Sequence, residues 1–296
     1  MVIVHVKHKD ESQFLYETAL STPVDDLAQK ITAIYNGRLK INRICVEIEE
    51  LAKHGTLLPP EIMGLTEEQV DELKLKDDWG EKCIPSGGFT INKDPIGRRN
   101  GKQPRKEMQD VLNNAVKQAK DLINKNLVLQ EKCLTFKIIQ EALNILRGAV
   151  TIVYPMKLPP HDIIRMEFEN IEDLTGTQAS LDVIDPATAQ LWFCGKELYR
   201  NEGQTLGSYA GKFENSKIIL KLSKRGDGAP SREPIMSEEQ RKQLMLHAYR
   251  KQEELKKLDQ DDDDNYLNSD WADGSNLKKS FHGLNNISWK PFSKSK

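Results

Sequence analysis

The chain has 296 residues with 43 Lys and Arg against 45 Asp and Glu, so its formal net charge is only −2. A charge this close to zero is not typical of a nucleic-acid-binding protein, which presents a strongly basic face to the phosphates. No run approaches the ~20 apolar residues that a membrane span needs. The segment Met1–Val6 also lacks the basic start and the small-residue cleavage site of a signal peptide. We therefore expect a cytosolic protein that does not bind nucleic acid or a membrane.

The four cysteines, Cys45, Cys83, Cys133 and Cys194, each stand alone in their segments. A structural zinc site usually pairs Cys or His residues a few positions apart. The spacing therefore favours reduced, packed thiols. We expect no bound metal and no cofactor.

The first elements, in residues 1–56, are predicted to be a strand, a second strand and a helix. Val2, Val4 and Val6 alternate with other residues, as in a strand with one apolar face. The segment Gln13–Thr18 is the expected return strand.

The helix that follows is expected to begin at Pro23, after the hydroxyl side chains that precede it, because proline fits the first helical turn. Asn36 and Gly37 predict an end or a break in this helix. A second helical run is expected over Leu39–Lys53, which carries one apolar stripe.

Residues 57–105 read as a loop-rich connector, because Pro and Gly interrupt every regular period. One short helix is predicted there, from the N-cap Thr66, with Gln69 completing a capping box, to about Leu75. A helical segment, residues 106–148, comes next. Its two helices are expected over Lys106–Asn124 and Thr135–Arg147.

The next segment, residues 149–224, is predicted to be a domain, and the sequence leaves open whether the N-terminal strand–strand–helix unit is separate from it or shares one sheet with it. Ala149–Tyr154 and Ile163–Glu169 are expected to be its first two strands, followed by a short helix from Leu174. Its most informative part is the run from Gln190 to Leu222, which reads as a strand, a tight turn, a capped loop and a final strand.

This run resembles the second half of ubiquitin. Gly195–Leu198 is similar to ubiquitin's Gly-Lys-Gln-Leu turn, and Thr205–Tyr209 is similar to its Thr-Leu-Ser-Asp-Tyr loop. The resemblance implies an α+β fold with a ubiquitin-like β-grasp domain at residues 149–224. It does not imply conjugation, because the chain continues past Leu222 without a terminal Gly-Gly. A binding module is the expected role.

Two residues of this segment are candidate partner contacts, Trp192 and Lys196. Trp192 aligns with the apolar residue at the centre of ubiquitin's partner-binding face, and a large exposed aromatic there would supply much of the binding energy. The alternative is that another part of the same chain covers Trp192, because large aromatics are mostly buried.

The connector contains a glycine-bounded basic run, Gly97–Gln103, that looks superficially like a phosphate-binding loop. It is one residue short between its glycines and has Gln where Mg²⁺ binding needs Ser or Thr. We interpret it as a basic turn. If exposed, Arg98 and Arg99 could contact an acidic partner.

The end of the chain is expected to comprise a linker at residues 225–236, a charged helix at 237–258 with Ser237 as its N-cap, and an acidic and aromatic tail at 259–296. The acidic run lacks the Gly turn and terminal Glu of a Ca²⁺ loop. Aromatic residues gather after it, including Trp271, Phe281 and Trp289. They predict a short segment that docks on the chain's own core or on a partner.

Several separate motifs resemble the Kurly family (cilia- and flagella-associated protein 298), over almost the whole chain. They are Trp79–Cys83, Asp94–Gly101, Leu146–Val150, Met166–Asn170, Gly228–Pro234, Tyr266–Asp273 and Phe281–Gly283. The resemblance implies assembly of the outer dynein arms of motile cilia, in the cytoplasm or at the basal body. It also implies roles in cilium positioning and planar cell polarity, with dynein assembly factors and axonemal dynein subunits as partners.

Three functions are therefore compared. The first is a non-enzymatic adaptor for dynein-arm assembly, and the second is a structural protein bound to axonemal doublet microtubules or dynein docking sites. The third, an enzyme, is disfavoured because no nucleophile, base and oxyanion donors can be assembled from the sequence. No small-molecule substrate is expected.

Overall fold

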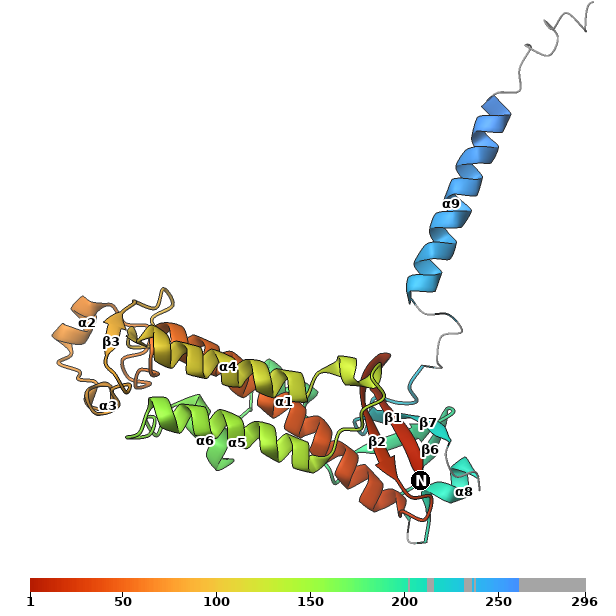
Figure 1. Ribbon diagram of the computed structural model, residues 1–296, viewed down its shortest axis with the longest axis horizontal. Helices are drawn as coiled ribbons and strands as arrows, with labels where there is room; N and C mark the ends of the chain where they lie inside the picture. Colours follow the sequence, from red (N-terminus) through yellow and green to blue (C-terminus); the bar gives the residue numbers. More distant parts are fainter. Residues whose placement is uncertain (202, 212–215, 232–235, 237, 261–296) are drawn as a thin grey trace, which may run out of the picture. The chain divides into compact units, whose positions relative to one another are not determined.

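A five-stranded mixed sheet joins the first and the last strands of the first compact unit (Figure 1). The computed structural model describes residues 1–201, 203–211, 216–231, 236 and 238–260. The strand order is β2-β1-β7-β5-β6, with β1 parallel to β7 and every other neighbouring pair antiparallel. These strands are β1 (Val2–His8), β2 (Glu11–Thr18), β5 (Gln190–Phe193), β6 (Lys196–Leu198) and β7 (Lys217–Ser223).

The helices of this unit pack mainly around one long helix, α1 (Val24–His54), with α4 and α5 side by side along it (Figure 1). The other helices are short. In chain order the helices after α1 are α2 (Glu67–Glu72), α3 (Asp78–Lys82), α4 (Lys106–Leu122), the 3₁₀ turn η1 (Lys125–Val128), α5 (Phe136–Val153), α6 (Ile163–Glu169), α7 (Gln178–Asp182) and α8 (Leu206–Ala210).

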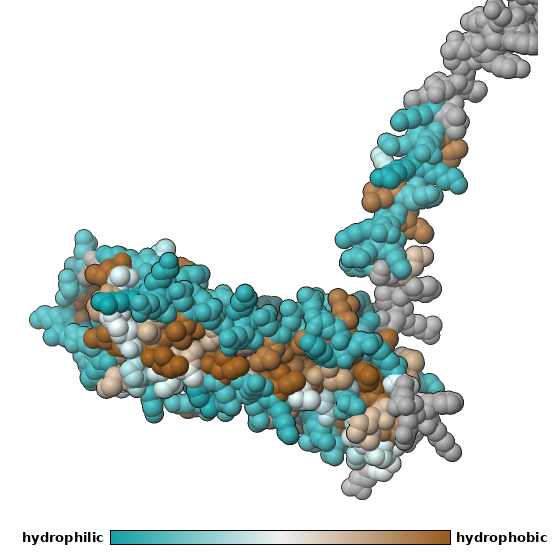
Figure 2. All heavy atoms as spheres, in the orientation of Figure 1, coloured by the Kyte–Doolittle hydropathy of each residue, from teal (hydrophilic) through white to brown (hydrophobic). Residues whose placement is uncertain are grey.

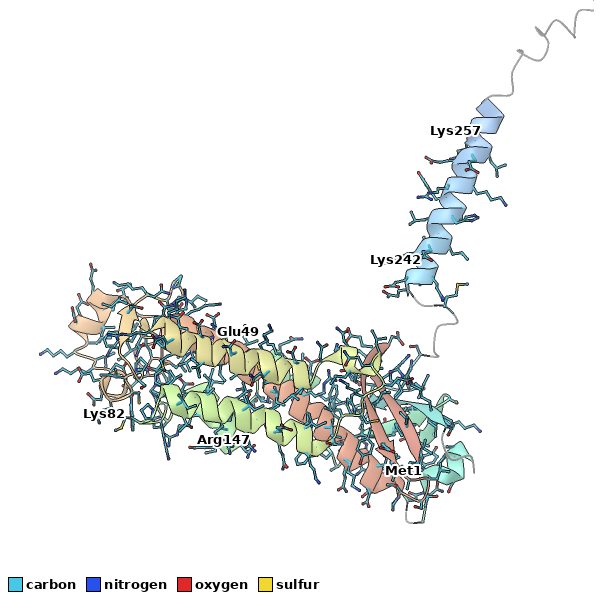
Figure 3. All side chains as sticks on the ribbon, in the orientation of Figure 1. Met1, Glu49, Lys82, Arg147, Lys242 and Lys257 are labelled. Carbon is cyan, nitrogen blue, oxygen red and sulfur yellow. The ribbon has the colours of Figure 1, made fainter. Side chains whose placement is uncertain are left out.

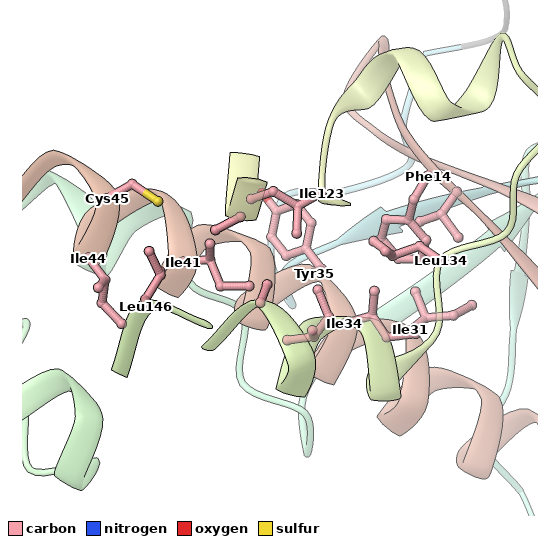
Figure 4. Close-up of a cluster of buried hydrophobic side chains, with 14 of the residues drawn as sticks. Phe14, Ile31, Ile34, Tyr35, Ile41, Ile44, Cys45, Ile123, Leu134 and Leu146 are labelled. Carbon is pink, nitrogen blue, oxygen red and sulfur yellow. The ribbon is translucent and has the colours of Figure 1, made fainter. Parts of the chain in front are cut away.

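A single apolar core runs from the inner face of the sheet into the space between α1, α4 and α5 (Figure 4). Alternation along β1 places Val2, Val4 and Val6 on the inner face, and none of them is exposed. Ile41 and Leu146 bring α1 and α5 into the same core. Burial of aliphatic side chains on this scale is the main force that stabilises the fold.

The expected break at Asn36 and Gly37 is wrong, because α1 continues through both residues. The Asn36 side chain holds the backbone of Ile184, donating from Nδ2 to the carbonyl oxygen (2.6 Å) and accepting from the amide nitrogen (3.1 Å). Gly37 gives room to Ile139 of α5. Both residues therefore serve contacts between elements rather than a helix end.

The connector contains the predicted capping box, in which the Thr66 hydroxyl accepts from the Gln69 amide and the Gln69 side chain accepts from the Thr66 amide. The helix α2 ends at Glu72, short of the expected Leu75. The connector also forms a small antiparallel pair, β3 (Phe89–Ile91) and β4 (Lys102–Pro104), which the sequence analysis did not predict.

The two strands expected at Ala149–Tyr154 and Ile163–Glu169 are helical instead. Gly148 does not end α5, because Leu146, Ala149 and Val153 fall on one helical face and are buried there. The second segment forms α6. Its N-cap Asp162 accepts a hydrogen bond from the Ile164 amide at 3.0 Å.

Beyond this point the two strands expected between Gln190 and Leu222 are present as β5 and β7, and the residues after the expected turn at Gly195 form a further short strand, β6. Cys194 and Gly195 both have positive φ angles, 49° and 79°, and form the two-residue turn that joins β5 to β6. The short helix expected from Leu174 begins only at Gln178. Together these elements confirm a mixed α+β protein.

Charged side chains cover the outer surface of the helices (Figure 3), while Figure 2 shows apolar surface along the line between α4 and α5. Glu49 of α1 forms an ion pair with Lys120 of α4 on this surface. None of the described helices is long and apolar enough to cross a membrane.

The second unit, Glu233–Lys296, is described from the single helix α9 (Glu238–Gln260). Its N-cap, expected at Ser237, lies outside the described residues. Leu244, Tyr249 and Leu255 are each more than half exposed on α9, and Figure 2 shows hydrophobic residues on the surface of this helix. This helix therefore presents apolar side chains to its surroundings.

Candidate interaction surface

The face of the sheet that points away from α1 is the first candidate site, and we call it the outer face. It is defined by Ile3, His5, Lys7, Trp192, Ile219 and Lys221. The strand register places His5 opposite Ile219, and both Lys7 and Trp192 opposite Lys221. Residues paired in this way share one face, so these side chains lie side by side.

Trp192 lies at the centre of β5, and its indole ring is partly exposed on the outer face. Its Nε1 donates a hydrogen bond to the Ser223 hydroxyl at 2.9 Å. The buried polar atom of the ring therefore has a partner within the sheet, and the remaining exposed surface is apolar. Such a ring can enter an interface without leaving an unpaired donor.

Lys221 on the same face is only 6% exposed, because the chain after β7 returns towards the turn between β1 and β2. Its Nζ donates to the Ser231 carbonyl at 2.7 Å and lies 3.1 Å from the Asp10 carboxylate. The Ser231 hydroxyl also donates to Asp10, and this bond together with Lys221 lowers the pKa of that carboxyl. The Lys221 side chain is therefore covered by the chain itself.

Lys196, the second candidate of this segment, lies opposite Phe193 and is exposed at the sheet edge. The side chains of the next pair, Trp192 and Glu197, point to the face opposite that of Lys196, because side chains alternate along a strand. The structure therefore does not bring Trp192 and Lys196 together on one surface.

Arg98 and Arg99 lie in the connector, beside the C-terminal part of α1, and only Arg98 is accessible. Arg99 is 5% exposed; its Nη1 donates to the Gly55 carbonyl at 2.8 Å and its Nη2 to the Glu47 carboxylate at 2.6 Å. Arg98 is 3.6 Å from Glu47 and keeps a partly exposed side chain. The condition of exposure is therefore met by Arg98, whereas Arg99 joins the connector to α1.

The surroundings of Arg99 contain two further buried polar groups. Burial raises the pKa of the Asp162 carboxyl, although Arg99 and the amides of Leu57 and Ile164 oppose this shift. The Tyr154 hydroxyl has no hydrogen-bond partner among the described residues, and burial raises its pKa as well. Neither group was singled out from the sequence.

A charged residue within an apolar stripe is a sequence signal that could have predicted two other buried groups, Arg38 and Glu167. Arg38 stands between Tyr35 and Ile41 on the apolar face of α1, and all three are buried. Glu167 occupies a similar position on α6 and is 1% exposed. Such residues need partners, because an unpaired buried charge is costly.

Trp271, Phe281 and Trp289 lie outside the described residues. Cys45 and Cys83 are buried, Cys133 is partly exposed and Cys194 is exposed. Burial raises the pKa of the Cys45 thiol to about 11. Within the described part of the chain, no group of three or more His, Cys, Asp or Glu side chains is placed to hold a metal ion.

The geometry defines an α+β protein in which a mixed sheet with a partly open outer face is joined to a layer of long helices. The family profile described as cilia- and flagella-associated protein 298 matches residues 189–287. No solved structure matches the chain.

Curated proteins named cilia- and flagella-associated protein 298 match nearly the full length. The Danio rerio protein is 57% identical over 98% of this chain and 100% of its own length. The Drosophila melanogaster protein is 56% identical over 98% and 99%, and the Homo sapiens protein is 56% identical over 98% and 100%. The chain belongs to the cilia- and flagella-associated protein 298 family.

Proposed function

We propose that the chain is a non-enzymatic adaptor for motile cilia, acting in the cytoplasm and at the basal body in the assembly of outer dynein arms. Membership of a cilia- and flagella-associated family supports the cellular context. The partners in this proposal are dynein assembly factors and axonemal dynein subunits. Cilium positioning and planar cell polarity belong to the same proposal.

The observation that carries the adaptor role is the environment of Trp192. An indole ring that is partly exposed in the middle of a rigid strand, with its N–H already bonded to Ser223, has the features of an interface anchor. Ile219 extends this apolar surface on the next strand, and it is 37% exposed. We take the open part of the outer face as the partner-binding surface.

We further infer that the sheet is a ubiquitin-like β-grasp. In support, a hairpin is followed by a long helix, and the last strand of the sheet lies parallel to the first, next to it. In this interpretation the two starting strands are β1 and β2. The residues between α1 and β5 are then an insertion that builds the helical layer.

Affinity purification from ciliating cells tests the adaptor proposal, with the cytosol and the axonemes analysed separately by mass spectrometry. The wild-type chain should recover dynein heavy chains and assembly chaperones from the cytosol. Trp192→Asp should reduce this recovery at least about tenfold, because truncation or charging of an interface anchor costs about 2 kcal/mol or more. Recovery mainly from axonemes, with tubulin or docking proteins, would identify a structural protein instead.

Trp79→Asp is the matched control, because Trp79 is also partly exposed (40%) but lies in α3 of the connector. It should leave recovery unchanged. The thermal midpoint of each variant shows whether the fold is intact. A Trp192 variant that is folded and recovers the same proteins as the wild type would exclude the outer face as the surface.

A further inference from the structure

A groove of about 310 Å³ lies beside the turn between β1 and β2, where α1, η1 and α7 meet. Its lining includes His8, Lys9, Tyr35, Arg38, Lys125 and Asp182. The groove is separate from the outer face, since His8 contacts the Tyr35 ring on α1, with a centroid distance of 5.2 Å. Nothing in the proposed adaptor function uses this groove.

Arg38 is the most unusual group in the groove, because its guanidinium is buried without a carboxylate partner in the described part of the chain. The residue is 5% exposed. Its Nε donates to the Ile123 carbonyl at 3.1 Å, and its Nη1 donates to the carbonyl and side-chain oxygens of Gln13 at 2.8 and 3.2 Å. All of these acceptors are neutral, and Nη2 donates to no oxygen of the described residues.

Burial makes this charge expensive. It lowers the pKa of Arg38 to about 10, with Tyr35 acting in the opposite direction. The Phe14 ring lies 5.8 Å from the guanidinium carbon and supplies only a weak compensation. A buried cation is normally offset by a paired anion, so the groove lacks a counter-charge at its floor.

The rim of the groove adds further positive charge. Lys9 is exposed in the turn, and Lys125 is 52% exposed. Lys125 is already paired with Glu11, which lowers the pKa of that carboxyl. Among the residues described, the lining holds three cationic side chains, Lys9, Arg38 and Lys125, but only two carboxylates, Glu11 and Asp182. One positive charge in the groove therefore has no carboxylate among these lining residues to offset it. The Nη2 group of Arg38 and the side chains of Lys9 and Lys125 line the same groove.

We propose that this groove binds an oxyanion, a carboxylate or a phosphate group, with the Arg38 guanidinium at its floor and Lys9 and Lys125 at its rim. Arginine presents planar N–H groups that match both kinds of oxyanion. The Tyr35 side chain lines the same groove, and its phenol is a hydroxyl donor.

The test follows the side-chain Nε–H resonance of Arg38 by NMR while the full chain is titrated with inorganic phosphate, with acetate and with chloride at constant ionic strength. Phosphate or acetate should shift this resonance along a saturating curve, and chloride should not. Saturation by acetate alone identifies a carboxylate site, and saturation by phosphate alone identifies a phosphate site.

Two exposed rim positions provide variants that should not disturb the fold. Lys9→Gln combined with Lys125→Gln should raise the midpoint about tenfold, because charge-assisted hydrogen bonds are lost. Glu11→Gln should lower the midpoint, because it frees Lys125 from its present partner. Lys217→Gln, which changes a lysine elsewhere on the sheet, is the control and should have no effect.

Either of two results would overturn the proposal. One is an Arg38 resonance that responds to chloride as strongly as to both oxyanions. The other is a midpoint that is the same in the wild type and in the double lysine variant. Arg38 would then serve only to join β2 to the end of α4 through its carbonyl contacts.

Discussion

Gly37 of α1 packs directly against Ile139 of α5. A Cβ atom built on the glycine would stand 2.6 Å from Cγ2 of Ile139, which is itself 1% exposed. Because Ile139 is β-branched, its Cγ2 cannot move away by a simple rotation without entering other buried groups. The glycine therefore sets the distance between the two helices, in the middle of a helix where alanine would be the better helix former.

Gly37→Ala should lower the free energy of unfolding by about 1 to 3 kcal/mol, the usual cost of overpacking a core. Gly148→Ala in α5 is the matched control, because no atom lies within 4 Å of its added Cβ. This control should be neutral or stabilise by up to about 1 kcal/mol. Urea denaturation measures both. If Gly37→Ala changed the free energy of unfolding as little as Gly148→Ala, α1 and α5 could separate at little cost.

At the same scale, the sequence left open which candidate side chains are exposed. Trp192 and Arg98 are partly exposed in the structure. Arg99 could not be told apart from Arg98 by its local sequence. Its burial depends on Glu47, which lies 52 positions away and meets it only in the folded chain.

At the scale of elements, the prediction succeeded where local signals are strong. Alternation, capping and turn residues are the local signals that predicted the β1–β2 hairpin, the capping box of α2 and the strands from Gln190 onwards. The run Ala149–Tyr154 misled the prediction because Val and Ile also favour strands. Tertiary packing determines the helical conformation of this run, because the helical period buries Ala149 and Val153 against the core.

The helix α6 is held to α1 by an ion pair whose two partners lie more than 120 positions apart in the sequence. Arg43 of α1 holds Glu167 by two bonds, Nε to Oε1 at 2.6 Å and Nη2 to Oε2 at 3.0 Å. The Glu167 side chain is 2% exposed, so its charge has little contact with water. This pair attaches α6 to the middle of α1.

Arg43→Ala should therefore lower the free energy of unfolding by about 3 kcal/mol, because it leaves a buried carboxylate without its main partner. Lys53→Ala, in the exposed pair with Glu50 on the same helix, is the control and should cost less than about 1 kcal/mol. Thermal or urea denaturation checks both. A loss at Arg43 as small as that at Lys53 would mean that Lys40, 3.8 Å from Glu167, replaces it.

At the scale of the whole first unit, the sheet takes its strands from both ends of a long stretch of chain. The parallel register places Val4 next to Ile218 and Val6 next to Leu220. The sequence left open whether the N-terminal strands form a separate unit or share one sheet with the strands after Gln190, and the pairing of β1 with β7 shows that they share one sheet. Long-range pairing of this kind leaves no local pattern, because it depends on how the intervening helices fold back.

This arrangement makes a prediction about the fragment 149–224, which resembles ubiquitin's second half. Alone it should not fold, because it lacks β1 and β2 and so loses the partner strand of β7 together with the Val2, Val4 and Val6 layer of the core. Its ¹⁵N–¹H spectrum should show the narrow amide dispersion of an unfolded chain.

The fragment 1–232 is the positive control and should give a dispersed spectrum. Addition of the fragment 1–148 should restore dispersion to 149–224, because each fragment carries the surface that the other buries. A dispersed spectrum from 149–224 by itself would show that these residues form an independent domain, and that β1 is added to a sheet already complete.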